Sequence, residues 1–353
     1  MRILQVATEQ AYPVYIGCHL LEGCGERIRQ VHSPSRVGLV TDSIVERFYL
    51  DLVQSSLEHV GFHCTPFVFP AGESSKNLTT YGQILESFAE AQLTRSDLIV
   101  ALGGGVTGDM TGFAAATYLR GLPWIQLPTT LLAAVDASVG GKTAVDLPNG
   151  KNLVGAFHQP LQVIFDTTCL DTLAQPQIQD GLAEMIKHGA IADPSLFQRL
   201  TKDFSSQSAD LEQVIARNVE IKESFVHTDE RDEGLRQILN FGHTIGHSIE
   251  KCSAYQISHG HAVAIGMVVE ARAARRLGLS QVHEDVLREA LERQGLPYHC
   301  PYPADWIYEA ALGDKKRSGN QIHVVKLVQI GQAERITLDL NTFRQFVSLG
   351  LED

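Results

Sequence analysis

The sequence predicts a two-domain protein, in which an α/β domain with a mainly parallel sheet precedes a mostly α-helical domain. Strand and helix patterns alternate through the first half, which is typical of a parallel sheet covered by helices on both faces. Helical periodicity then dominates the second half. The pattern changes near residue 172, and we therefore predict domains at residues 1–172 and 173–353.

The composition excludes several classes of protein. A chain of 353 residues, 44% hydrophobic and 20% charged, is long enough for two hydrophobic cores. Its formal charge of −12 argues against nucleic-acid and anionic-membrane partners, which bind basic surfaces. No apolar run approaches the roughly 20 residues that span a bilayer, and the six cysteines form no CxxC pair. We expect a soluble, cytoplasmic protein with reduced thiols.

The first half opens with a hairpin pattern at residues 3–7 and 14–16, after which β-rich runs recur. The predicted strands are residues 36–41, 64–69, 98–102, 124–127 and 163–166. The helical patterns between them are a segment ending near residue 60, residues 78–92, residues 107–118 and a segment after Thr129. Sheets of this kind bind ligands in the loops at the carboxyl ends of their strands.

One of these loops is rich in glycine. The strand at residues 98–102 runs into Gly103-Gly104-Gly105, and a helix begins shortly after. Glycine allows close approach of the backbone, and exposed amides at a helix start favour an anion such as a pyrophosphate. The spacing is not the dinucleotide fingerprint G-x-G-x-x-G. The alternative is an ordinary tight turn; the glycine run favours a Rossmann-like nucleotide site.

A second glycine pair is misleading. Gly140-Gly141-Lys142-Thr143 resembles the end of a phosphate-binding P-loop, but Asp136 stands where that motif needs its first glycine, so we reject an ATPase. A set of polar residues surrounds this segment. They are either held in place by packed apolar neighbours or scattered over the surface. The set is Thr129, Thr130, Asp136, Lys142, Asp146, Lys151 and Asn152.

The second half reads as a series of helices with one small β element. The predicted helices are residues 178–191, 194–201, 210–225, 234–252, 259–277, 283–294, 306–312 and 341–349. The β element comprises residues 321–328 and 334–338.

Four histidines lie within nineteen residues of this half: His243, His247, His259 and His261. His243 and His247 are four apart in a helical pattern, so both imidazoles share a face and can bind one cation. The alternative is histidines that cap or pack within a helix. The sequence favours a metal site but leaves its ligand set open.

Further charged side chains accompany this cluster. Glu184 and Lys187 are three apart in an apolar helical pattern, either as a surface ion pair or with Glu184 as a third ligand. Arg236 and Asn240 would share a helical face with His243 or His247. A metal ion beside a nicotinamide cofactor suits oxidation of an alcohol on an acidic, hydroxylated substrate.

The motifs in both halves resemble the 3-dehydroquinate synthases of the sugar phosphate cyclase superfamily. Among them are Pro70-Ala71-Gly72-Glu73 and Asn240-Phe241-Gly242-His243. The matching segments, in order, are residues 70–76, 103–109, 128–133, 136–143, 183–189, 240–247, 259–260 and 314–316. The resemblance therefore spans nearly the whole chain and implies the dehydroquinate synthase-like fold.

The resemblance also implies a set of site residues. A divalent metal, zinc or cobalt, would be held by Glu184, His243 and His259. The implied NAD contacts are Asp42, Glu73, Lys76, Gly104, Gly105, Asp109, Thr129, Thr130, Lys142, Lys151, Asn152, Cys169, Thr172, Leu173 and Gln177. The implied substrate and catalytic residues are Asp136, Lys142, Lys187, Lys222, Arg236, Asn240, His247, Lys315 and Lys316, with Arg120 reaching the neighbouring subunit of a homodimer.

The implied substrate is a sugar-acid phosphate, 3-deoxy-D-arabino-heptulosonate 7-phosphate. The family oxidises it transiently with NAD, eliminates phosphate, reduces the product, opens the ring and closes a carbocycle by an aldol reaction in the shikimate pathway. Asp232, where the family usually has Glu, and His261, where Glu is frequent, depart from the pattern. The alternatives are another sugar phosphate cyclase and a metal-dependent polyol or alcohol dehydrogenase.

Overall fold

The computed structural model describes residues 1–312, 317–318 and 320–352 of the chain, which folds into two compact units. Unit one comprises Met1–Leu173 and Ala209–His227, and unit two comprises Ala174–Ser208 and Thr228–Asp353. The predicted division into residues 1–172 and 173–353 differs at Leu173, which belongs to unit one, and in one longer segment. Residues 209–227 return to unit one, where His227 Nδ1 lies 3.0 Å from the carbonyl oxygen of Ala7.

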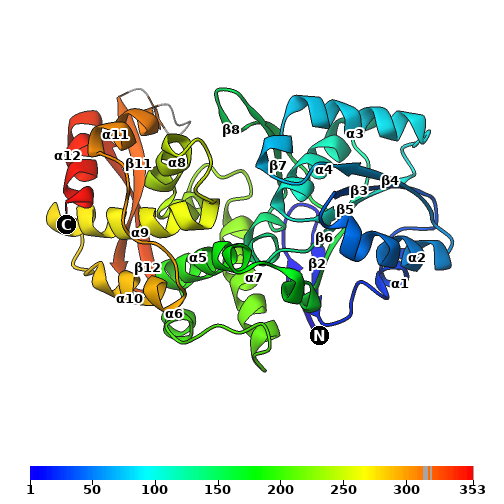
Figure 1. Ribbon diagram of the computed structural model, residues 1–353, viewed down its shortest axis with the longest axis horizontal. Coiled ribbons are helices and arrows are strands. Elements are labelled where there is room, and N and C mark those ends of the chain that lie inside the picture. The colour runs from blue at the N-terminus through cyan, green and yellow to red at the C-terminus, as the bar shows by residue number, and fades with distance from the viewer. Residues whose placement is uncertain (313–316, 319, 353) are drawn as a thin grey trace. The chain divides into compact units, whose positions relative to one another are not determined.

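A seven-stranded sheet, in the order β1-β2-β9-β6-β5-β3-β4, forms the centre of unit one (Figure 1). Every neighbouring pair is parallel except β1 and β2, which form the predicted hairpin. Its strands are β1 (Arg2–Val6), β2 (Tyr12–Gly17), β3 (Arg36–Asp42), β4 (His63–Phe69), β5 (Leu98–Gly103), β6 (Trp124–Pro128) and β9 (Gln162–Asp166). The predicted mainly parallel sheet is therefore confirmed.

Helices cover both faces of this sheet because its central strands are apolar on both sides. In β5, Leu98, Val100 and Leu102 pack on one face with α1 (Cys24–Arg29) and α2 (Asp51–His59). Ile99 and Ala101 face the other way, toward α3 (Leu78–Glu90) and α4 (Gly105–Thr117) (Figure 1). The sheet is thereby buried, and its carboxyl edge carries loops that contain several of the predicted binding residues.

The remaining elements of unit one are short, apart from a hairpin and a returning helix. The hairpin pairs β7 (Lys142–Leu147) with β8 (Gly150–Phe157). The other elements are η1 (Glu46–Leu50), η2 (Glu73–Ser75), η3 (Tyr118–Arg120), η4 (Ala133–Ala137), η5 (Thr167–Thr172) and α7 (Leu211–Thr228).

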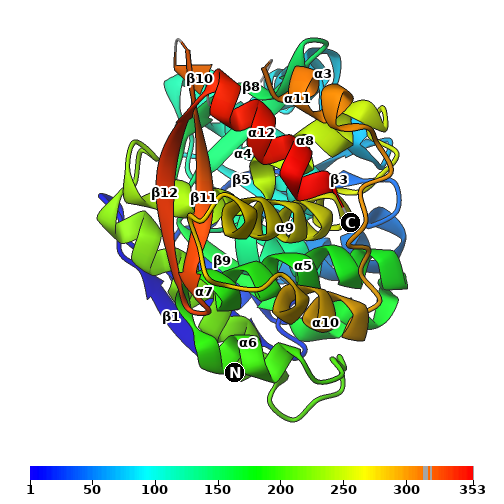
Figure 2. The same cartoon turned by 90° about the vertical axis from the view of Figure 1, so that its left-hand side faces the viewer.

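Unit two is organised around α9 (His259–Arg276), a helix buried along most of its length (Figure 2). It contacts α5 (Gln175–Ala192), α8 (His243–Cys252) and α12 (Leu340–Leu351). The hairpin of β11 (Gln321–Gln329) and β12 (Gln332–Asp339) confirms the predicted β element. The other elements are α6 (Pro194–Leu200), η6 (Leu235–Asn240), α10 (Asp285–Arg293), α11 (Ala304–Leu312) and β10 (Arg317–Ser318). In the described part of the chain, no helix is both long and apolar enough to cross a membrane.

The predicted helix at residues 234–252 is wrong as a single element. It is divided into η6 and α8 by Gly242, whose φ of 79° is left-handed. A Cβ on Gly242 would also lie 2.8 Å from the carbonyl oxygen of Val263, so only glycine fits this turn. Arg236 and Asn240 therefore do not continue the helical face of His243 and His247.

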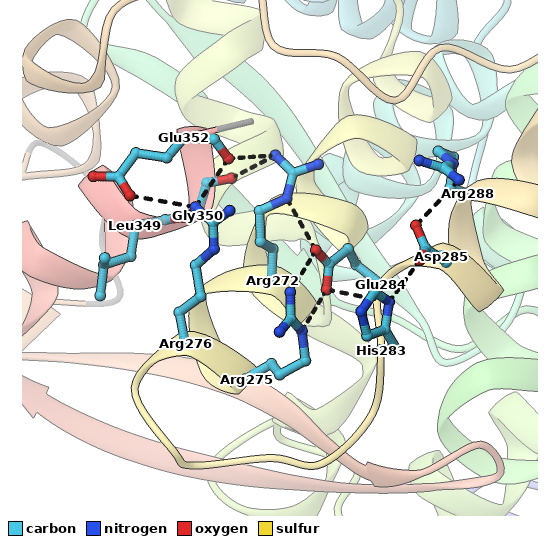
Figure 3. A network of polar contacts seen from close by, with 10 residues as sticks. All are labelled: Arg272, Arg275, Arg276, His283, Glu284, Asp285, Arg288, Leu349, Gly350 and Glu352. Carbon is cyan, nitrogen blue, oxygen red and sulfur yellow. Dashed lines mark hydrogen bonds and ion pairs between the residues drawn. The ribbon is translucent and has the colours of Figure 1, made fainter.

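A network of arginines ties the end of α9 to the start of α10 and to the carboxyl-terminal helix (Figure 3). Glu284 accepts hydrogen bonds from Arg275 Nε at 2.8 Å and Arg272 Nε at 3.3 Å. Arg276 donates to the carbonyl oxygen of Leu349. Burial disfavours the charged carboxylate, but the hydrogen bonds from Arg275 outweigh it and lower the pKa of Glu284 to about 2.

We predict that Glu284→Gln lowers the free energy of unfolding by about 1–3 kcal/mol, because the arginines lose their buried anionic partner. The stabilisation by Glu284 should be fully present above its unfolded pKa of about 4.3 and disappear as the pH falls toward 2. Urea denaturation at several pH values measures both effects. Glu289→Gln, an exposed change in α10, is the control; equal stability of the two variants at neutral pH contradicts the prediction.

Candidate functional site

The candidate site in unit two begins with a buried carboxylate. Glu184 lies in the middle of α5 among apolar side chains and has no exposed surface. Lys187, one turn further along and also buried, forms an ion pair with it. An isolated charge at such a position is unstable, so Glu184 requires compensating cations. The interpretation as a surface ion pair is excluded by this burial.

Two imidazoles supply part of that environment. His243 is the first residue of α8 and His259 the first residue of α9. The Nε2 atoms of both rings lie 3.5 Å from Glu184 Oε1. Their Nδ1 atoms point elsewhere, that of His243 to the carbonyl oxygen of Phe241 at 3.2 Å and that of His259 to the carboxylate of Glu250 at 3.3 Å.

This geometry fits a divalent metal ion. Zinc bonds of about 2.0–2.2 Å at tetrahedral angles place ligand atoms roughly 3.3–3.6 Å apart, which brackets the two measured separations. One carboxylate and two imidazoles are a donor set typical of catalytic zinc. Glu184, His243 and His259 form one of the groups of side chains whose ligand atoms all lie within 4.8 Å of one another. Their role as metal ligands stays a prediction.

The backbone around His259 is fixed from α5. Asp180, one turn before Glu184, accepts hydrogen bonds from Ser258 Oγ at 2.6 Å and from the amide of Gly260 at 3.0 Å. A Cβ on Gly260 would lie 2.3 Å from Asp180 Cα, so glycine is required for this approach. The helix that supplies Glu184 thus also positions the residues on either side of His259.

A comparable contact fixes His243. Glu270, buried in α9, accepts hydrogen bonds from the amides of Gly242 at 2.9 Å and Ile245 at 3.4 Å at the start of α8. Asp180 and Glu270 both bind amides at a helix start that carries a candidate ligand. The carboxylate of Asp180 offsets the positive end of α9, and that of Glu270 offsets the positive end of α8. Either helix end would otherwise repel a cation.

The other two histidines of the cluster lie differently. The His247 ring is 5.4 Å from the His243 ring and 6.1 Å from the His259 ring, measured between centroids. His247, Glu250 and His259 form a second group of possible metal ligands. His261 Nε2 lies 3.2 Å from Gln179 Oε1, so it is engaged with α5.

Burial and nearby carboxylates have opposite effects on the pKa of His259. Burial lowers the pKa of an imidazole, but the carboxylates of Glu250 and Glu184 outweigh this and raise the pKa of His259 to about 10. Metal ligation requires the neutral ring. A metal ion that binds at neutral pH must therefore displace a proton from His259.

The remaining predicted residues of unit two lie in and before η6. Arg236 is buried and donates from Nη1 to the carbonyl oxygen of Glu230 at 2.7 Å, while Asn240 is half-buried at the end of η6. Asp232 has a φ of 60°, a conformation that Asp adopts more readily than Glu, which gives a physical reason for its departure from the family pattern. Lys315 and Lys316 lie outside the described residues.

In unit one the glycine-rich segment has the predicted local structure. β5 ends at Gly103, Gly104 is the cap residue, and α4 begins at Gly105. The amide of Thr129 donates to the carbonyl oxygen of Gly103 at 3.0 Å, and the side chain of Thr130 caps the next turn by accepting from Ala133 N at 3.1 Å. The helix start, whose cap residue has no side chain, is suited to a pyrophosphate.

A polar network includes several of the predicted NAD contacts. Lys76 Nζ lies 2.5 Å from Asp109 Oδ2 and 2.6 Å from Asn152 Oδ1. Burial lowers the pKa of this lysine, but Asp109 and Glu73 outweigh it and the net shift is upward. Lys151 pairs with Glu73 at 2.7 Å. The structure thus brings these five residues together.

Asp42 contributes to the same edge of the sheet. Its Oδ1 accepts from the amides of Ile44 and Val45, and its Oδ2 lies 3.4 Å from Thr107 Oγ1 in α4.

The predicted catalytic residues of unit one fall in three places. Lys222 in α7 binds Asp136 through both its carboxylate at 2.7 Å and its carbonyl oxygen at 2.5 Å. Lys142 is exposed at the start of β7. Leu119 and Arg120 have φ values of 48° and 69°, which indicate a strained turn. The side chain of Arg120 is exposed.

The last predicted NAD contacts differ in their burial and in the unit to which they belong. Cys169 belongs to the core of unit one and has no exposed surface, and burial raises the pKa of its thiol to about 12. Thr172 accepts or donates a 2.8 Å hydrogen bond with the hydroxyl of Tyr49, and Leu173 is half-buried at the end of the same segment. Gln177 lies in unit two, where its side chain caps α5 by accepting from the amide of Ala174.

Similar solved structures define the class of protein. A 2-deoxy-scyllo-inosose synthase complexed with carbaglucose-6-phosphate, NAD+ and Co2+ is 26% identical, with a TM-score of 0.87 over 98% of this chain and 99% of that one. A 2-epi-5-epi-valiolone synthase from Streptomyces hygroscopicus subsp. jinggangensis, with NAD+ and Zn2+ bound, has the same fold, with 24% identity and a TM-score of 0.85 over the full length of both chains. The chain therefore has the fold of the sugar phosphate cyclases.

The particular family follows from closer relatives. Family models described as 3-dehydroquinate synthase N-terminal and C-terminal match residues 66–180 and 181–317. The 3-dehydroquinate synthase of Clostridium acetobutylicum is 43% identical over 94% of this chain and 95% of its own length. The chain belongs to the 3-dehydroquinate synthase family.

We predict that His259→Ala removes the metal ion almost completely, whereas His247→Ala retains about one ion per subunit, because His259 Nε2 lies 3.5 Å from Glu184 Oε1 and belongs with it to the ligand group that includes His243. Elemental analysis after gel filtration in metal-free buffer measures the content. Equal losses in both variants would show that the ligand assignment is wrong.

Proposed function

We propose that this chain converts 3-deoxy-D-arabino-heptulosonate 7-phosphate to 3-dehydroquinate and phosphate in the cytoplasm, as a lyase that depends on NAD and a divalent metal. The family supports the reaction. The observation in the structure that supports it most is the pair of imidazole nitrogens 3.5 Å from the buried carboxylate of Glu184. A buried carboxylate with two imidazoles beside it is typical of a functional site.

The two units supply different parts of the machinery. Glu184, His243 and His259 would hold zinc or cobalt, and the glycine-rich edge of the sheet with its neighbouring network would hold NAD. When bound, the metal supplies Lewis acidity toward a hydroxyl oxygen, and NAD supplies a reversible hydride acceptor. The proposed reaction involves no net oxidation, so phosphate would be released without accumulation of NADH.

The side chains of the protein handle the charges of the substrate. We assign its carboxylate and phosphate to the cations Lys142, Lys187, Lys222 and Arg236, with Asn240 and His247 as hydrogen-bonding neighbours. Asp136 holds the ammonium of Lys222 through two oxygens, and the carbonyl oxygen of Glu230 holds the guanidinium of Arg236. Cations fixed in this way stabilise developing anions without reorganising during the reaction.

We also propose a homodimer in which Arg120 completes the site of the neighbouring subunit. The exposed side chain and the two successive positive φ values at Leu119 and Arg120 support this role. Backbone strain of this kind costs on the order of 1–3 kcal/mol per residue and persists mainly where function requires it.

The reaction is tested by measuring phosphate released from the heptulosonate phosphate in the presence of catalytic NAD. We expect phosphate and 3-dehydroquinate to form in equal amounts while the absorbance of NADH stays at its starting level. Steady accumulation of NADH with a simple polyol, and no phosphate release, would instead identify a dehydrogenase.

We predict that Arg120→Ala lowers kcat by about two orders of magnitude through loss of a positioned cation, while each subunit still retains its metal ion. Because the arginine acts on the partner, coexpression of Arg120→Ala with the inactive His243→Ala should restore activity in the mixed dimers. A random mixture should recover about a quarter of wild-type activity, since half the dimers are mixed and each has one intact site. No recovery in purified mixed dimers contradicts the cross-subunit role.

A further inference from the structure

The imidazole of His259 is held at both of its nitrogens. Nε2 lies 3.5 Å from Glu184 Oε1, on the side of the proposed metal. Nδ1 lies 3.3 Å from Glu250 Oε2. A histidine that binds a metal through one nitrogen commonly donates the other N–H to a carboxylate or carbonyl, which fixes its tautomer and the orientation of its ring.

Glu250 is well placed for this contact. It lies near the end of α8, two turns after His243, and is 98% buried although it carries an ionisable group. Its carbonyl oxygen accepts from the amide of Tyr255 at 2.8 Å and from Ser253 Oγ at 2.8 Å. Ser253 Oγ in turn accepts from the amide of Ile257 at 3.1 Å. The residue that contacts the His259 ring therefore also anchors the loop that leads into α9.

The second candidate imidazole ligand has a matching but neutral partner. His243 directs Nε2 to Glu184 Oε1, and its Nδ1 lies 3.2 Å from the carbonyl oxygen of Phe241. Both rings thus direct Nε2 toward Glu184, and the carboxylate of Glu250 lies behind the ring of His259. An ionised acceptor forms a stronger hydrogen bond than a carbonyl and makes the ring a stronger donor to the metal.

We infer that Glu250 is a positioning residue, which holds His259 with Nε2 toward the metal and increases its strength as a ligand. The inference rests on the metal centre of the proposed function and adds to it a residue that binds neither metal nor substrate. Asp180 fixes the backbone on either side of His259, and Glu250 fixes the ring. Together they remove the freedom that an exposed loop histidine would have.

The competing possibility is that Glu250 is itself a ligand. Its carboxylate, His247 and His259 could hold an ion in the second group of side chains. In that case His259 would have to use its Nδ1 for this ion, because its Nε2 faces Glu184. The two roles predict different numbers of bound ions.

The test compares Glu250→Gln and Glu250→Leu with the wild-type chain by titrating metal-free protein with Co2+ against a competing chelator. We expect Glu250→Leu to weaken Co2+ binding by about 10–100-fold and to change the visible absorption bands of the bound ion. Glu250→Gln should lie between, since its amide oxygen still accepts from Nδ1 without the charge. The wild-type chain should bind one Co2+ per subunit.

Glu284→Gln provides a matched control, because it alters another buried glutamate of unit two that is distant in sequence from His243 and His259. It should lower the unfolding midpoint and leave the affinity and spectrum of Co2+ unchanged. An affinity of folded Glu250→Leu within about twofold of wild type, with the same spectrum, overturns the inference. So does a wild-type chain that binds two ions and a Glu250→Leu variant that binds one.

These measurements contain no substrate. A chain whose Co2+ affinity depends on Glu250 but that releases no phosphate contradicts the proposed reaction and leaves the role of Glu250 standing.

Discussion

The buried charge of Glu184 is the constraint on which the arrangement of unit two depends. A carboxylate with no exposed surface, in an apolar stretch of helix, is stable only among cations. Lys187 provides one from the same helix, and His243 and His259 approach from two others. The carboxylates of Glu250 and Glu184 raise the pKa of His259 to about 10 against the effect of burial, and metal ligation would require its neutral ring.

The helices that carry the imidazoles impose a second electrostatic requirement. A histidine at the first position of a helix brings the positive end of that helix toward the cation it would bind. Asp180 and Glu270 bind the amides at these two helix starts and offset that effect. The same contacts fix α9 against α5 and α8 against α9, so the electrostatic and the geometric requirements are met by the same hydrogen bonds.

Unit one also contains a buried charge, that of Lys76, which other residues stabilise. Lys76 is buried but stays charged because Asp109 and Glu73 surround it, and Asn152 orients its ammonium. Segments distant in the sequence meet in this network, including η2, α4 and β8. The return of α7 adds Lys222, whose ammonium is held by Asp136. These contacts hold both lysines within unit one.

The sequence by itself determined the fold class, most of the elements and the identity of Glu184, His243 and His259 as candidate ligands. Those conclusions rest on hydrophobic periodicity and on motifs, both of which are local. It did not reveal the break at Gly242, because a left-handed residue inside a helical pattern gives no periodic signal, or the return of residues 209–227 to unit one. The position of Glu250, three residues after His247, weakly indicated that it lies near the histidines. No sequence pattern indicated the roles of Asp180 and Glu270. Only the tertiary structure decided which carboxylates face which histidines, since these pairs are joined by packing between helices that the sequence keeps apart.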